Sequence, residues 1–128
     1  MLSFLDTNAC IDLLRGRVRG RRLPAYAQCR LSSIVVAELW TGVRKSDDPE
    51  KHRKSLTAFL ELFEIVPFDE KAAQHYGEIR AHLETSRTPI GPLDQLIASQ
   101  ARSQGASLLT ANLREFQRVP GLKCQAWE

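Results

Sequence analysis

The stretch Leu2-Ser3-Phe4-Leu5-Asp6-Thr7-Asn8 decides the fold, because an apolar strand runs directly into residues that can start a helix. Either Thr7 or Asn8 can cap that helix with its side-chain oxygen. Asp6 stands between the two elements, at a place where a carboxylate is costly to bury unless a partner stabilises it. We therefore expect other polar or charged groups of the chain to meet Asp6 at the end of this first strand.

The rest of the chain repeats this alternation. Strand-like apolar runs are expected at 2–5, 29–32, 63–66, 107–110 and 122–126, and helices at about 7–14, 33–43, 49–62, 70–83 and 93–103. Strands that alternate with helices predict βαβ crossovers and a mainly parallel sheet of about five strands, with helices on both faces. The predicted fold class is therefore α/β.

The composition is that of one globular domain over residues 1–128. The 128 residues are 43% hydrophobic and 26% charged, with a formal net charge of +3. No apolar run reaches the ~18 residues that a membrane span needs, and no leader-peptide pattern opens the chain. The three cysteines are far apart and lack C-x-x-C spacing, so we expect reduced thiols in a cytoplasmic protein.

Acidic residues near predicted strand ends are candidates to join Asp6, since ligand sites in open α/β sheets form at the carboxyl ends of strands. Glu38 lies among apolar neighbours just after the second strand, although a surface glutamate on an amphipathic helix would look similar. Asp94 lies in the first turn of a helix, where an acid also offsets the helix dipole. The preceding Ile90-Gly91-Pro92, with a glycine hinge and a fixed proline φ, favours a directed turn and a functional Asp94.

A fourth position follows the fourth strand, in Thr110-Ala111-Asn112-Leu113-Arg114-Glu115-Phe116. Glu115 is either an acid of the same site or a surface loop residue. Asn112 is the alternative, as a neutral oxygen ligand or a residue that holds water. The sequence leaves both interpretations open.

Several carboxylates in one cleft repel one another, and a divalent cation removes that cost. Ligands that are all oxygen atoms select Mg²⁺ or Mn²⁺ over zinc. The three histidines show no zinc-motif spacing, and the chain has no glycine-rich phosphate loop or G-x-S-x-G motif. Carboxylate-bound Mg²⁺ at an open cleft suits attack of an activated water on a phosphodiester, with one ion or two.

A basic segment lies between the first helix and the second strand, with arginines at Arg15, Arg17, Arg19, Arg21 and Arg22. Two glycines and the alternating pattern argue against a buried helix and predict a mobile loop. The loop is either a solvated segment that keeps the protein soluble, or a contact for phosphates or for an acidic partner.

Taken in order, these segments resemble the PIN-domain toxins of the VapC type. The resemblance is carried by Leu5-Asp6-Thr7-Asn8, by Leu31-Ser32-Ser33 with Glu38, by Ile90-Gly91-Pro92-Leu93-Asp94-Gln95-Leu96-Ile97-Ala98, by Thr110-Ala111-Asn112-Leu113-Arg114-Glu115-Phe116 and by Arg118-Val119-Pro120-Gly121-Leu122. Each segment alone is a weak signal. The ordered set covers essentially the whole chain and is highly specific.

The resemblance implies a compact PIN-like α/β/α sandwich and a Mg²⁺- or Mn²⁺-dependent endoribonuclease that cuts structured RNA, tRNA or rRNA, and so inhibits translation and growth. It also implies a type II toxin–antitoxin pair. In this family a VapB-type antitoxin wraps the toxin with its C-terminal segment and can place a basic side chain near the acids. Homodimers are usual, and the antitoxin implies higher oligomers.

Carried over by position, the resemblance implies that Asp6, Glu38 and Asp94 bind the metal and act in catalysis. Many PIN nucleases have an aspartate just after the fourth strand. This chain has Asn112 there, so Glu115 is the nearest acid for the fourth catalytic position, directly or through water.

Three hydroxyl and amide residues beside these acids have two interpretations: they orient acids and water by hydrogen bonds, or they are turn and cap residues. They are Thr7, Asn8 and Thr110.

Two other functions fit parts of the pattern. A PIN-like module that binds RNA or protein without cutting would be expected to lose one of the core acids, and all three are present. A phosphoryl-accepting domain also has an aspartate at a strand end. The dehalogenase type needs a second aspartate two residues after Asp6, where this chain has Asn8, and the acidic pair and late lysine of a receiver domain are not apparent.

Overall fold

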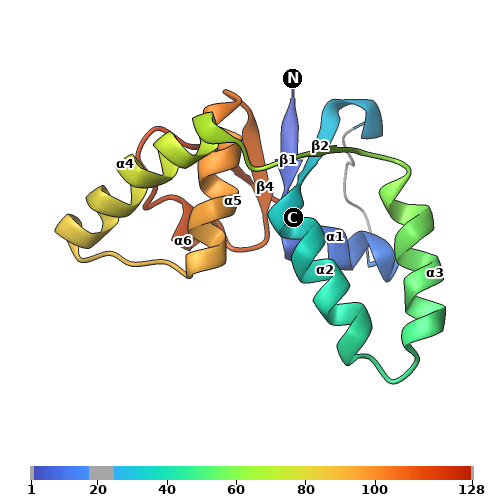
Figure 1. The fold of residues 1–128 in the computed structure, drawn as a ribbon. Coiled ribbons are helices and arrows are strands. Elements are labelled where there is room, and N and C mark those ends of the chain that lie inside the picture. The colour runs from blue at the N-terminus through green and yellow to red at the C-terminus, as the bar shows by residue number, and fades with distance from the viewer. Residues whose placement is uncertain (1, 18–24, 128) are drawn as a thin grey trace.

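The computed structural model describes residues 2–17 and 25–127. Its centre is a five-stranded sheet in the order β3-β2-β1-β4-β5, in which every neighbouring pair is parallel (Figure 1). The strands are β1 (Ser3–Leu5), β2 (Cys29–Ser32), β3 (Glu64–Val66), β4 (Ser107–Thr110) and β5 (Lys123–Ala126). The predicted strands and their parallel arrangement are confirmed.

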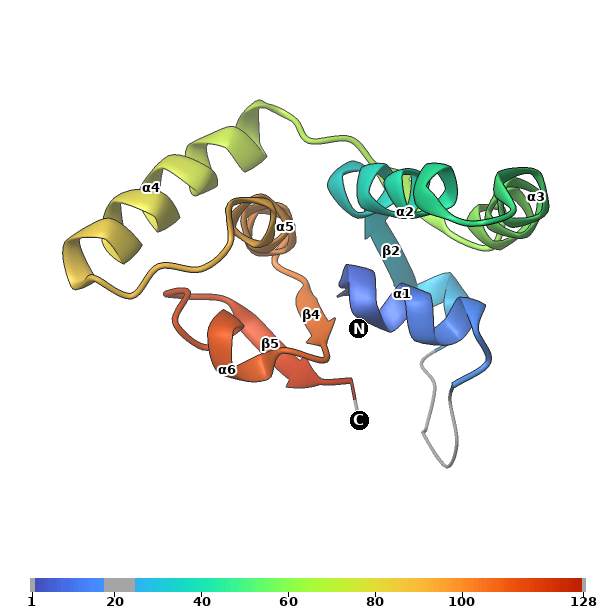
Figure 2. The same cartoon turned by 90° about the horizontal axis from the view of Figure 1, so that it is seen from below.

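Helices fill the connections between the strands. They are α1 (Thr7–Leu14), α2 (Ser33–Lys45), α3 (Pro49–Leu60), α4 (Glu70–Ser86), α5 (Pro92–Ser103) and α6 (Leu113–Phe116), and a 3-10 turn, η1 (Tyr26–Gln28), precedes β2. Helices α1 and α5 lie on opposite sides of the central strands, α4 covers the outer side of α5, and α3 packs beside α2 (Figure 2). The fold is the expected α/β/α sandwich. Helix α6 was not predicted, because four residues are too few to show a helical period.

The register of the central strands brings their carboxyl ends to one edge of the sheet. Leu5 of β1 pairs with Leu109 of β4, and both strands are buried along their whole length. A buried parallel pair needs apolar side chains on both faces, which Phe4 and Leu108 supply at 0% exposure. The residues that follow the two strands therefore lie next to each other, although they are far apart in the sequence.

Aspartates begin three of the helices. Asp48 and Asp69 cap α3 and α4 by accepting backbone N–H groups of the first turn. The cap of α1 was assigned incorrectly: Asp6 itself accepts the backbone N–H of the first turn, and Thr7 is already the first helical residue. Such a cap contributes about 1 kcal/mol to helix stability, so Asp6 has a structural role in addition to any chemical one.

Part of the basic segment belongs to the described structure. Arg15 and Arg17 are exposed directly after α1, whereas Arg19, Arg21 and Arg22 lie outside the described residues. All three cysteines are free thiols, as expected. Within the described residues, no helix is both long and apolar enough to cross a bilayer.

Candidate active site

Asp6 is fixed where β1 meets α1. Its backbone N–H donates to the Leu109 carbonyl oxygen at 3.0 Å, which continues the pairing of β1 with β4. Its Oδ1 accepts the Ala9 N–H at 2.8 Å. Its Oδ2 accepts the Thr110 hydroxyl at 2.5 Å and the Ala111 N–H at 3.3 Å. A carboxylate with only 4% exposure is thus held by three donors.

These donors and burial have opposite effects on the pKa of Asp6. Burial is the largest influence and raises the pKa of Asp6, and the nearby charge of Asp12 raises it further. The hydrogen bonds from Thr110, Ala9 and Ala111 lower the pKa, because each of them stabilises the anion. Thr110, whose hydroxyl also accepts the Asn112 N–H at 2.8 Å, therefore orients an acid and is more than a turn residue.

Glu38 reaches the same region from α2. Ser32 at the end of β2 caps this helix by accepting the Ile34 N–H, so α2 starts at the carboxyl edge of the sheet. The Thr7 hydroxyl of α1 donates to Glu38 Oε1 at 2.7 Å. This hydrogen bond joins two residues that are 31 positions apart, and it gives Thr7 an orienting role.

Asp94 comes from the first turn of α5, with Gly91 as the N-cap residue and Pro92 as the first helical residue. Burial, followed by the negative charges of Glu115, Glu38 and Asp6 in that order, raises the pKa of Asp94 to about 6. The other three acids therefore act on Asp94, as expected for a carboxylate that shares a site with others.

The role predicted for Gly91 is wrong in its mechanism. Its φ of −56° and ψ of 147° are open to any residue, so the turn does not need a flexible hinge. A Cβ at this position would lie 3.4 Å from Asp94 Oδ2, an ordinary van der Waals contact, so the space beside the carboxylate does not require a glycine either.

One cavity of about 220 Å³ collects these side chains, and it is lined by Asp6, Thr7, Asn8, Glu38, Asp94, Asn112 and Phe116. Three carboxylates from β1/α1, α2 and α5 thus face the same space. Phe116 was not singled out in the sequence, because an apolar residue in a short helix looks like any core residue. It is 1% exposed and lines the cavity as its one large apolar side chain.

The fourth position is divided between two residues. Asn112 lines the cavity, and as N-cap residue of α6 it makes no side-chain capping hydrogen bond. Glu115 does not line the cavity, yet its charge is the largest electrostatic influence on the pKa of Asp94. Asn112 therefore lines the cavity, and Glu115 lies close enough to Asp94 for its charge to act on that acid.

The donor set suits a hard divalent cation, because carboxylate and amide oxygens are the ligands that Mg²⁺ and Mn²⁺ prefer. The mutual repulsion that raises the pKa of Asp94 is also what a cation would relieve. Within the described residues, no three acidic, histidine or cysteine side chains come close enough to form a complete ligand cluster. Mg²⁺ usually keeps several of its water molecules and binds through one or two carboxylates, so the chemistry fits without such a cluster.

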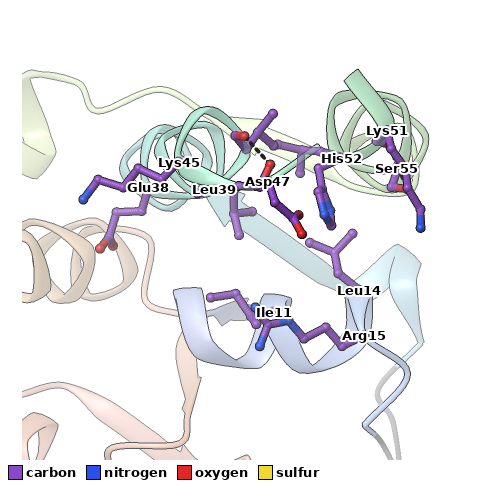
Figure 3. Close-up of a pocket in the computed structure, with 14 residues that line it drawn as sticks. Ile11, Leu14, Arg15, Glu38, Leu39, Lys45, Asp47, Lys51, His52 and Ser55 are labelled. Carbon is purple, nitrogen blue, oxygen red and sulfur yellow. Dashed lines mark hydrogen bonds between the residues drawn. The ribbon is translucent and has the colours of Figure 1, made fainter. Parts of the chain in front are cut away.

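A second and larger cavity, of about 640 Å³, forms a groove between α1, α2 and α3 (Figure 3). Its apolar lining comes from Ile11, Leu14, Leu39, Val43 and Leu56, and its cationic lining from Arg15, Lys45 and Lys51. Glu38 lines both this groove and the acidic cavity, so the two spaces meet at that residue.

Apart from Arg15 and Glu38, the groove residues were missed in the sequence. Leu39, Gly42 and Val43 of α2 and its C-cap residue Ser46 recur at helical spacing, which could have indicated one open face. The direction from which α1 and α3 approach that face cannot be predicted from the sequence of α2 alone, because it depends on the tertiary fold.

Comparisons with known proteins agree with the fold. A family model described as "PIN domain" matches residues 3–122. The "tRNA(fMet)-specific endonuclease VapC" of Salmonella typhimurium is 40% identical over 131 residues, covering 99% of each chain. The "Ribonuclease VapC2" of Rickettsia felis is 38% identical and covers 100% of this chain and 99% of its own.

Solved structures show the same relationship. The DNA-bound VapBC of Salmonella typhimurium matches with a TM-score of 0.89 at 37% identity, covering 100% of both chains. The VapBC2 of Rickettsia felis bound to a promoter DNA fragment matches with a TM-score of 0.88 at 34% identity. The chain therefore belongs to the PIN-domain family and, within it, to the VapC-type ribonuclease toxins of toxin–antitoxin systems. Its activity class is that of an endoribonuclease.

Proposed function

We propose that this ribonuclease is a Mg²⁺-dependent enzyme, with Mn²⁺ as a substitute, that hydrolyses a phosphodiester bond of structured RNA and thereby inhibits translation and growth in the cytoplasm. The observation that carries the proposal is the meeting of Asp6, Glu38 and Asp94 in one cavity at the carboxyl edge of the sheet. Asp94, whose pKa is raised by burial and then by the other acids, would respond to a bound cation by ionising more readily.

The side chains divide the work according to how they are held. Asp6, Asp94 and Glu38 would hold the cation, which when bound supplies a water of lowered pKa and neutralises phosphate charge. Asp6 offers a fixed oxygen because three donors orient it. Glu38 is oriented by the Thr7 hydroxyl. Asn112 lines the cavity without a capping bond, which leaves its amide available to position water or RNA.

The proposed substrate is tRNA or rRNA. The name of the Salmonella relative, a tRNA(fMet)-specific endonuclease, supports tRNA as the first RNA to test. Recognition of such RNAs depends on shape and on exposed loops more than on a linear sequence. The basic residues from Arg15 to Arg22 would contact either this RNA or the partner protein.

The proposed partner is a VapB-type antitoxin, which would form higher oligomers with a toxin homodimer. Related chains were solved as VapBC complexes, which supports such a partner. The groove between α1, α2 and α3 suits a segment with an apolar side, since Ile11 and Leu39 point toward one another across it (Figure 3). Because Glu38 lines both spaces, a segment in the groove would extend to the acids and block them.

The test is cleavage of purified tRNA and of total bacterial RNA with Mg²⁺, with Mn²⁺ and with chelator. We expect a discrete metal-dependent product that Asp94→Asn does not form. Glu70→Gln is the matched control, because Glu70 also lies in the first turn of a helix but is exposed and outside the cavity. If folded wild-type protein cuts no RNA with either metal, the chain is a PIN-like module that binds RNA or protein without cutting.

A further inference from the structure

Trp127, the residue after β5, is hydrogen-bonded to two elements that flank Asp6. Its backbone N–H donates to the Thr110 carbonyl oxygen at 2.7 Å, just beyond the pairing of β4 with β5. Its indole Nε1–H donates to Asp12 Oδ2 of α1 at 3.1 Å. The side chain is only 5% exposed, so the indole N–H depends on a protein acceptor.

These contacts complete a ring that starts and ends at Asp6. Asp6 caps α1, and α1 carries Asp12. Asp12 accepts the indole N–H of Trp127, and Trp127 donates its backbone N–H to Thr110. The Thr110 hydroxyl then donates back to Asp6 Oδ2 at 2.5 Å. Trp127 is therefore the link that joins α1 to the end of β4, the two elements between which Asp6 is held.

We propose that Trp127 is a positioning residue of the acidic site, which fixes α1 against the end of β4 and thereby fixes the direction of the Asp6 carboxylate. Trp127 does not line the cavity, so it acts through Asp12 and Thr110. The effect of Trp127 on catalysis rests on the proposed function, whereas its effect on the direction of the Asp6 carboxylate does not.

The ring also explains why an indole serves better here than another large apolar residue. A phenylalanine would fill only part of the same buried space and would leave the Asp12 carboxylate without the Nε1–H donor. Asp12 lies close enough to Asp6 for its charge to act on it. A shift of Asp12 or of α1 therefore changes both the electrostatic field at the Asp6 carboxylate and the position of the helix terminus that Asp6 caps.

The experiment uses Trp127→Phe in the full chain, which keeps an aromatic side chain, removes the Nε1–H donor and shortens the side chain by one ring. We expect kcat for RNA cleavage to fall by about tenfold, the scale of a lost partner behind a metal ligand, with KM for RNA unchanged. An ¹⁵N-labelled, metal-free sample supplies the second readout. The amide resonance of Ala9, which donates to Asp6 Oδ1 at 2.8 Å, should shift. Asp12→Ala should reproduce both effects, and the double variant should be no worse than the more severe single variant.

Trp40→Phe is the matched control, since Trp40 is a half-buried indole on α2 that packs against the core outside the ring and the cavity. The proposal is overturned if Trp127→Phe leaves the Ala9 resonance in place, or if kcat falls only as far as in Trp40→Phe of equal stability. If Trp127→Phe does not fold, Asp12→Ala decides by the same two readouts. A wild-type protein that cuts no RNA would refute the proposed function while the Ala9 resonance still decides this inference.

Discussion

Replacing Asp94 by asparagine should remove cleavage and yet stabilise the metal-free protein above neutral pH. Asparagine has nearly the same shape but no charge, so it escapes the repulsion of Glu115, Glu38 and Asp6. The pKa of Asp94 is raised from 3.8 to about 6 in the folded protein. A group whose folded pKa is raised contributes stability that is fully present below its unfolded pKa and is lost as pH rises through the folded pKa.

The size of the effect follows from that difference. One pKa unit corresponds to about 1.4 kcal/mol, so a rise from 3.8 to about 6 sets an upper bound of about 3 kcal/mol at pH 8. Asp94 is only partly buried, so solvent screening reduces this figure. Loss of the favourable charge in the first turn of α5 removes a further ~0.3–1 kcal/mol. The expected net gain for Asp94→Asn is therefore about 1–2 kcal/mol at pH 8.

Urea denaturation in chelator, at intervals from pH 4 to pH 8, measures this difference. The gain should grow between pH 4 and pH 7 and should be close to zero or reversed at pH 4. Glu70→Gln should show no such growth. Added Mg²⁺ should stabilise the wild type more than Asp94→Asn, since a ligand that binds only the folded state raises its stability. A variant that is less stable than the wild type at pH 8, or a difference that does not change with pH, would refute the reasoning.

Two further predictions concern the groups around the acids. Thr110→Val should lower the free energy of unfolding by about 1.5–3 kcal/mol in urea denaturation, because a buried hydrogen bond to a charged group is lost. Thr110→Ser keeps the hydroxyl and should stay near wild type. An equal loss of stability in both variants would show that only packing matters at this position. Lys51→Glu should weaken binding of the antitoxin about tenfold in calorimetry, the equivalent of about 1.4 kcal/mol, because Lys51 lines the groove. Lys54→Glu, on the same helix but outside the groove, should not. If Lys51→Glu instead raises KM for RNA at unchanged antitoxin affinity, the groove holds RNA.

Local patterns predicted most of the fold because each element carries its own signal. Short apolar runs gave the strands, and Asp48-Pro49 and Asp69 marked helix starts. The errors arose where local signals compete. At the first helix, Thr7 or Asn8 was expected to be the cap, whereas Asp6, a candidate for the site, is itself the cap.

The candidate site was predictable in part for a topological reason. Parallel strands end at one edge of the sheet, and β1 and β4 are neighbours, so Asp6 and the segment after β4 lie next to each other. The orienting contacts were not predictable, because they depend on register across long separations. Thr110 and Asp6 are 104 positions apart, and Trp127 and Asp12 are 115 positions apart. The groove depends likewise on how α1 and α3 approach α2.

Asp6 and Asp94 differ in what acts on their charge, and in the proposed function this difference gives them different tasks. Asp6 is almost wholly buried, but three donors favour its anion, so it holds a fixed direction at the sheet edge. Asp94 is influenced mainly by burial and by other acids, and all of these raise its pKa. A cation entering the cavity therefore finds one oriented carboxylate and one whose ionisation it favours. Binding of the cation and charging of Asp94 are then linked, so that the affinity for Mg²⁺ should increase as pH rises through about 6.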